Sequence, residues 1–270
     1  MKYFSCIDKN EKPLENMPID GGFTSIFRTI GFIGDSLSSG EHESLTNGVK
    51  GYHDYYEYSW GQYIARKCGL QAYNFSVGGL KCKTFFDNLD KFQVFNALNK
   101  CQAYVIALGV NDMNHLDEVY KDGFGSIDDV DFNNEDNNKD SYVGWYVKII
   151  QKLRKFEPKC RIFVVTTPKE DPESDDKRKK FDMVENFLTD LPNHFKFLYT
   201  INLRKYGPIY SKEFGDIYFC GGHMNAMGYK LTGDMISSYI DYIIRHNYKD
   251  FTQVGFIGRP NDIHNEKETW

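Results

Sequence analysis

Short apolar runs alternate with stretches of helical periodicity from residue 28 onward. Continuous apolar runs of strand length predict strands that are covered on both faces, because such strands have no polar side. The run at residues 103–109 fits this description, and four further segments are predicted as strands, at residues 28–34, 70–76, 161–167 and 196–202. Helical spacing predicts helices at residues 59–69, 142–156, 178–191 and from about Asn225 to about Arg245. The alternation predicts an α/β fold, a three-layer α/β/α sandwich with a roughly five-stranded parallel sheet.

Two stretches, residues 122–140 and 169–180, are too polar to belong to the core. Both come directly after predicted strands or their loops, so we expect them near the carboxyl ends of the strands, where open α/β sheets bind ligands. The first is acidic, but it lacks the glycine and the glutamate that a calcium-binding EF-hand loop has at its sixth and twelfth positions. We therefore expect no metal site.

Composition limits the class of protein. The length of 270 residues fits one domain over residues 1–270, with a core at about 28–245 and extensions at both ends. A net charge of -5 gives no positive field for nucleic acid. The six cysteines form no CxxC pair, which indicates buried thiols. The N-terminus turns polar after six residues and no apolar run has the length of a membrane span, so we expect a cytoplasmic protein without a membrane partner.

Four short segments carry candidate chemistry. Gly34-Asp35-Ser36-Leu37 ends the first predicted strand, where a serine hydroxyl lies at the carboxyl edge of the sheet. Asp35 and Ser36 are also residue types that cap helices, so this segment alone is weak support for a nucleophile. Three more segments follow the second strand, follow the third strand and precede the last helix: Asn74–Gly79, Gly109–Asp112 and Gly222–Asn225.

Together these segments resemble the SGNH (GDSL-type) hydrolase family over about residues 28–245. That family carries a GDS serine, a glycine after the second strand, a GxND asparagine and a late histidine usually written DxxH. The resemblance implies a flavodoxin-like SGNH fold with Ser36 as nucleophile and His223 as base. It also implies an oxyanion hole made by the backbone N–H groups of Ser36 and Gly79 and the side-chain amide of Asn111, with Gly78 as the alternative to Gly79.

The chemistry explains these residue types. A serine hydroxyl needs an imidazole to accept its proton, and the negative charge of the tetrahedral intermediate needs prepositioned donors. We expect hydrolysis of a carboxylic ester through an acyl-Ser36 intermediate, without a metal or an organic cofactor. Polar loops and the lack of an apolar lid helix favour a short acyl group, such as acetyl, on a carbohydrate. The expected partner is thus a small-molecule or carbohydrate ester.

One position departs from the family pattern. Cys220 stands three residues before His223, where the family has the aspartate that orients the imidazole, and a thiol is a weak acceptor. A main-chain carbonyl near Cys220, a replacement carboxylate such as Asp216, or reduced activity are the three alternatives. The cluster Glu41-His42-Glu43 follows the serine closely and could line the mouth of the pocket, but a solvated loop is the favoured interpretation.

Two rival functions remain open at this point. The first is a catalytically degenerate SGNH-fold protein that binds carbohydrate, since the orienting aspartate is missing. The second is a flavodoxin-like nucleotide or phosphate binder, which the βα pattern also fits. The absence of any GxGxxG or GxxxxGK[ST] run disfavours the second.

Overall fold

The core of the molecule is a parallel sheet of five strands. The computed structural model describes residues 8–258, so Cys6 and the first residues of the N-terminus, on which the expected location partly rests, lie outside the described residues. The strand order is β4-β1-β5-β6-β7, and every neighbouring pair is parallel. The strands are β1 (Thr29–Gly34), β4 (Gln71–Ser76), β5 (Ala103–Ala107), β6 (Arg161–Val165) and β7 (Leu198–Ile201). All five correspond to the predicted runs.

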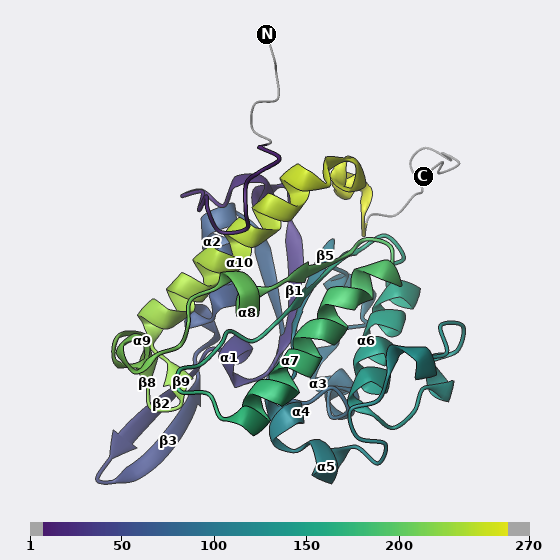
Figure 1. Cartoon of the computed structure of the whole chain (residues 1–270). Coiled ribbons are helices and arrows are strands. Elements are labelled where there is room, and N and C mark those ends of the chain that lie inside the picture. Colours follow the sequence, from purple (N-terminus) through teal and green to yellow (C-terminus); the bar gives the residue numbers. More distant parts are fainter. Residues whose placement is uncertain (1–7, 259–270) are drawn as a thin grey trace.

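Long helices cover both faces of the sheet (Figure 1). On one face, α2 (Trp60–Cys68) and α10 (Ala226–His246) bury a cluster that includes Phe32 and Val105. On the other face, α6 (Tyr142–Phe156) and α7 (Asp175–Asp190) bury a second cluster. Successive residues of a strand face opposite sides, so each inner strand feeds both clusters. The predicted three-layer sandwich is confirmed.

Capping residues explain why the long helices begin and end close to the predicted positions. Ser59 accepts a hydrogen bond from the N–H of Gln62 at the start of α2, and Gly69 ends that helix in the left-handed conformation. Asn225 accepts from the N–H groups of Met227 and Gly228 at the start of α10. These short polar residues are readable in the sequence, so local chemistry sets the bounds.

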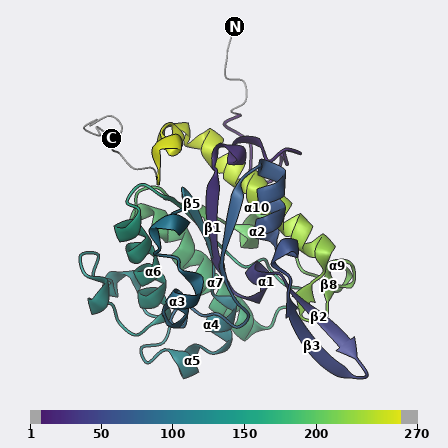
Figure 2. The same ribbon diagram turned by 180° about the vertical axis from the view of Figure 1, so that it is seen from behind.

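A hairpin that the sequence analysis did not predict leaves the body directly after the first strand (Figure 2). It consists of β2 (Glu41–Thr46) and β3 (Val49–Asp54), paired antiparallel, and it follows the single turn α1 (Ser36–Ser39). Its side chains are mostly exposed or half-buried, so it lacks the apolar pattern by which the core strands were recognised.

Short elements complete the edge of the sheet at which the strands end. They are α3 (Leu89–Phe92), α4 (Val110–Asn114), α5 (Leu116–Val119), α8 (Leu203–Tyr206), α9 (Lys212–Tyr218), β8 (Phe219–Cys220) and β9 (His223–Met224). Figure 1 shows β2, β8 and β9 close together beside α9. The β2–β3 hairpin and the short β8–β9 hairpin therefore lie side by side although they are far apart in the sequence.

The structure corrects the expectations about the two polar stretches and confirms the one about most of the cysteines. The stretch at residues 122–140 runs along α6. Its Glu135 is buried and pairs with Lys152 near the C-terminal end of that helix. The expectation that this stretch lies at the carboxyl ends of the strands is therefore only partly correct. Residues 175–180 are the first turns of α7 rather than a loop. Among the described cysteines Cys220 is exposed, and the others are free and buried, as expected: Cys68, Cys82, Cys101 and Cys160.

Candidate active site

Ser36 is the first residue of α1, directly beyond the end of β1. Asp35 caps this turn, because its carboxylate accepts the N–H of Leu37 at 3.1 Å. Gly34 allows the sharp bend, since a Cβ at this position would lie 2.1 Å from Oγ of Ser38. The capping role is thus real for Asp35, and it places the neighbouring serine at the carboxyl edge of the sheet.

Asn111 and the glycine loop lie next to this turn. Asn111 follows β5 in α4, and its Nδ2 lies 3.3 Å from Oδ2 of Asp35 and 3.4 Å from the carbonyl oxygen of Leu80. Gly79 has a φ of 74°, a left-handed conformation that favours glycine. Three separate βα loops, those after β1, β4 and β5, therefore meet at one point.

Asp112 fixes two of these loops to each other. Its buried carboxylate accepts the backbone N–H of Cys82 at 2.8 Å and the hydroxyl of Tyr120. Burial raises the pKa of this carboxyl. These contacts orient the segment that carries Asn111.

His223 lies in β9 between two carboxylates of the β2–β3 hairpin. Its Nδ1 is 2.8 Å from Oε1 of Glu43, and its Nε2 is 3.1 Å from Oε1 of Glu41. Within residues 8–258, Oγ of Ser36 makes no hydrogen bond to the imidazole. The ring of Tyr52, from the same hairpin, lies edge-to-face beside His223 with centroids 5.8 Å apart. The imidazole therefore has a carboxylate at each nitrogen and an aromatic ring at its side.

The carboxylate of Glu43 is well partnered and nearly inaccessible to solvent. Its side chain is 7% exposed. Oε1 also accepts the backbone N–H of Gly222 at 2.7 Å, and Oε2 pairs with Nζ of Lys50 at 3.2 Å. The hydrogen bond with His223 is the main cause that lowers the pKa of this carboxyl. Glu43 thus carries its negative charge at the position that faces Nδ1.

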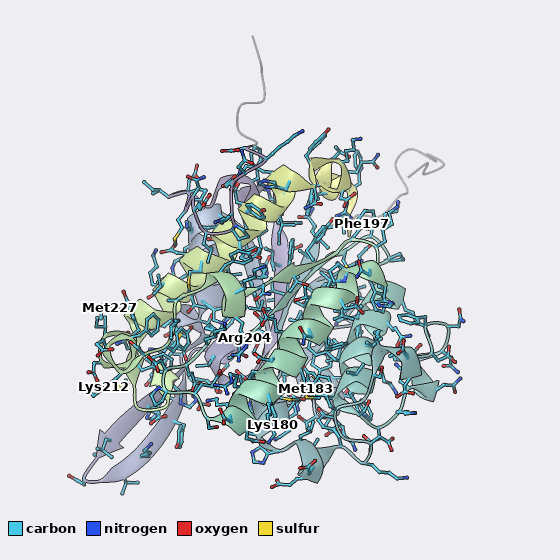
Figure 3. The ribbon with its side chains drawn as sticks, viewed as in Figure 1. Lys180, Met183, Phe197, Arg204, Lys212 and Met227 are labelled. Carbon is cyan, nitrogen blue, oxygen red and sulfur yellow. The ribbon has the colours of Figure 1, made fainter. Side chains whose placement is uncertain are left out.

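Neither expected orienting group faces Nδ1 of His223. Cys220 pairs with His223 across the β8–β9 hairpin, and its thiol is exposed, 3.8 Å from the main-chain oxygen of Glu43. Asp216 lies on the surface of α9 and pairs with Lys212 at 2.7 Å; Figure 3 labels Lys212 at the outer edge of the molecule. In the described part of the chain, Nδ1 of His223 faces Oε1 of Glu43 and neither a main-chain carbonyl near Cys220 nor the carboxylate of Asp216, so both expectations are corrected in favour of a carboxylate of the β2–β3 hairpin.

The spacing of Glu41 and Glu43 is the sequence feature that could have identified Glu43. Glu41 and Glu43 are two positions apart, and alternate residues of a strand point to the same side. A strand over this cluster would have placed both carboxylates on one face. The segment was interpreted as a solvated loop because it is polar, and polarity does not exclude a strand that projects from the body.

The model of the GDSL-like Lipase/Acylhydrolase family matches residues 30–236. The chain belongs to this family. No curated protein matches the sequence. Membership places the chain among the carboxylic ester hydrolases, in agreement with the resemblance seen in the four segments.

Solved structures resemble this GDSL-family hydrolase at low sequence identity. A family two carbohydrate esterase from Clostridium thermocellum, in complex with cellohexaose, is 16% identical with a TM-score of 0.56, over 89% of this chain and 66% of that one. An acetyl xylan esterase is 16% identical with a TM-score of 0.51, over 78% and 99% of the two chains. A putative lipolytic protein of the G-D-S-L family from Desulfitobacterium hafniense DCB-2 is 13% identical with a TM-score of 0.52, over 78% and 99%. At these identities the likeness concerns the fold, and it confirms the expected SGNH architecture.

A small cavity of the GDSL-family hydrolase lies beside the turn that carries Ser36, although Ser36 itself does not line it. Its volume is about 80 Å³, and both residues that flank Ser36, Asp35 and Leu37, line it. Apolar side chains supply most of the remaining wall, among them Trp60, Leu108, Val165, Leu203, Met224 and Ile236. Over the described part of the chain, no cluster of three or more His, Cys, Asp or Glu could hold a metal ion, and no helix has the length and apolar character of a membrane span.

Proposed function

We propose that this GDSL-family protein removes a short acyl group, such as acetyl, from a carbohydrate by ester hydrolysis. Ser36 is the nucleophile and His223 is the base. The observation that carries the proposal is the meeting of the Ser36 turn, the Gly79 loop and Asn111 at one sheet edge, in a chain whose family model covers residues 30–236. His223 comes to the same edge through the β8–β9 hairpin.

The reaction follows from the chemistry of these groups. Nε2 of His223 accepts the hydroxyl proton as Oγ of Ser36 attacks the carbonyl carbon of the ester. The tetrahedral intermediate collapses, the carbon–oxygen bond to the alcohol breaks, and Nε2 returns the proton to the leaving oxygen. Water then attacks the acyl-Ser36 ester by the same route, so that a carboxylic acid and free enzyme result.

Three donors receive the negative charge of the intermediate: the N–H groups of Ser36 and Gly79 and the amide of Asn111. The amide now makes two long contacts, at 3.3 and 3.4 Å. Hydrogen bonds of this length are weak, so a substrate oxyanion competes well for one of the two hydrogens. Each such donor typically contributes about 3 to 4 kcal/mol to stabilisation of the transition state.

His223 has to exchange one partner before it can act. Its Nε2 faces Glu41 in the free protein, whereas proton transfer requires that it faces Ser36. Catalytic hydrogen bonds in free enzymes are often long or poorly aligned and form fully only when substrate is bound. A modest change in the position of the Glu41 side chain is therefore part of the proposed binding step.

The substrate class is supported by three observations. The cavity of about 80 Å³ suits a short acyl chain. Tyr52, 57% exposed beside His223, offers an aromatic face to a sugar ring. Two structural neighbours are named as a carbohydrate esterase in complex with cellohexaose and an acetyl xylan esterase. A carbohydrate acetyl ester meets all three conditions.

Hydrolysis of p-nitrophenyl acetate, butyrate and octanoate tests the proposal. We expect the acetate to be cleaved fastest, and we expect Ser36→Ala and His223→Ala each to lower kcat by about 10³-fold or more. A fluorophosphonate probe should label wild-type protein and should not label Ser36→Ala. Absence of both hydrolysis and labelling would instead favour a degenerate carbohydrate-binding protein. Release of acetate from acetylated xylan then tests the carbohydrate part of the proposal.

A further inference from the structure

We propose that Glu43 is the positioning residue of His223, and that the β2–β3 hairpin supplies the carboxylate that is missing at Cys220. The inference rests on the proposed function, because Glu43 acts through the catalytic histidine. It assigns a role to a segment that carries none of the four family motifs.

The contact geometry assigns a specific role to each of the two hairpin carboxylates. Oε1 of Glu43 lies 2.8 Å from Nδ1, the nitrogen that takes no part in proton transfer. Glu41 lies at Nε2, the nitrogen that must face the serine, so Glu41 cannot orient the ring during the reaction. Only Glu43 can hold a proton on Nδ1 and leave Nε2 free as the base.

The surroundings of the Glu43 carboxylate form a fitted recess. Its two oxygens are held by Gly222, His223 and Lys50. A Cβ would lie 2.1 Å from Oε2 at Gly221 and 2.8 Å from Oε1 at Gly222, so the paired glycines leave room for the carboxylate. Gly221 and Gly222, directly before His223, therefore have no side chains at the place where the Glu43 carboxylate lies.

Three contacts fix the base of the hairpin, one to α10, one to α1 and one between its own two ends. The hydroxyl of Tyr229 in α10 donates to the carbonyl oxygen of Glu41 at 2.5 Å, and Oγ of Ser39 donates to Asp54 at 2.5 Å. The N–H of Tyr55 donates to the carbonyl oxygen of Gly40 at 3.1 Å. A carboxylate on a projecting hairpin can orient a catalytic ring only if its base is fixed, and these contacts meet that condition.

The role has a defined chemical consequence. A carboxylate at Nδ1 keeps the imidazole in the tautomer whose Nε2 accepts the serine proton, and it stabilises the imidazolium that forms in the transition state. An amide in its place can still accept one hydrogen bond, but it carries no charge and can also donate to the ring. The resulting loss falls on kcat, because the imidazolium forms only during the reaction.

The test compares Glu43→Gln, Glu43→Asp and the control Glu57→Gln, a substitution of the same type in the turn after the hairpin. We expect Glu43→Gln to lower kcat on p-nitrophenyl acetate by about 10² to 10⁴-fold with KM changed less than about threefold. We expect Glu43→Asp to keep at least tenfold more kcat than the glutamine variant, and Glu57→Gln to equal wild type. Thermal unfolding of each variant checks that it is folded.

The outcomes separate this inference from the proposed function. If Ser36→Ala abolishes activity and Glu43→Gln stays within about threefold of wild type, the role of Glu43 is overturned and the serine mechanism stands. An equal loss in the aspartate and glutamine variants indicates a structural role and also overturns the inference. Activity that survives in Ser36→Ala overturns the proposed function itself.

Discussion

Asp35 combines a capping role with a buried, costly charge. Its carboxylate is 4% exposed and accepts hydrogen bonds from the N–H of Leu37 and the amide of Asn111. Burial, as the largest cause, raises the pKa of this carboxyl to about 7. The folded protein therefore binds a proton at Asp35 between about pH 4 and pH 7, whereas the unfolded chain does not.

The linkage gives a direction for stability. Where the folded state binds more protons than the unfolded state, the free energy of unfolding falls as pH rises. The Asp35 carboxyl thus costs stability progressively from about pH 4 to pH 7 and by its full amount above that range. Because asparagine caps helices as well as aspartate does, Asp35→Asn removes the buried charge and keeps the cap.

We predict that Asp35→Asn equals wild type in stability near pH 4 and exceeds it by on the order of 2–4 kcal/mol at pH 8. Urea unfolding at both pH values measures this difference. A stability difference that does not depend on pH would contradict the assignment of a raised pKa to Asp35.

Among the smaller elements, the β2–β3 hairpin presents two carboxylates to one imidazole, and they have opposite effects. In the proposed mechanism Glu43 supports His223 as the base, while Glu41 faces Nε2, the nitrogen that Ser36 needs. The side chain of Glu41 is 13% exposed and lies against Gly78, where a Cβ would be 2.3 Å from its Oε2. Glu41 therefore competes with the serine for the imidazole.

We predict that Glu41→Gln raises kcat/KM on p-nitrophenyl acetate about three- to tenfold, because the substitution removes the electrostatic attraction between the Glu41 carboxylate and the imidazole, and an ion pair of partly exposed groups contributes up to about 1 kcal/mol. The rate of Ser36 labelling by a fluorophosphonate should rise by a similar factor. Leu45→Ser, an exposed position of the same strand, serves as the control and should change neither rate. A lower rate in the glutamine variant would show that Glu41 assists catalysis.

For the whole molecule, the sequence predicted the parts of the fold that local patterns encode. The inner strands are short apolar runs that alternate with stretches of helical spacing, and the long helices carry visible caps, so the sheet and these helices were predicted nearly to their ends. The four segments proposed to be catalytic were picked out by their motifs, and three of them lie together because loops after parallel strands converge on one edge. The contact between Glu43 and His223 was not predicted, because the two residues are far apart in the sequence and no local pattern pairs a polar hairpin with a distant histidine.

Ion pairs between residues far apart in the sequence also connect the loops at the carboxyl edge of the sheet. Arg204 of α8 takes part in such pairs. Its side chain is 1% exposed and pairs with Glu173, itself 7% exposed, at 2.9 Å and with Asp182 of α7 at 2.7 Å. These contacts join the loops that follow β6 and β7. Figure 3 labels Arg204 between α8 and α7, well inside the outline of the molecule.

We predict that Arg204→Met lowers the free energy of unfolding by about 3 to 5 kcal/mol, because the substitution leaves the buried carboxylate of Glu173 without its partner. The control is Lys212→Met, which removes the same charge from an exposed pair with Asp216, and which should change stability by less than about 0.5 kcal/mol. Thermal and urea unfolding measure both variants. Equal stabilities would show that solvent reaches Glu173 and that the pair contributes no more than a surface ion pair.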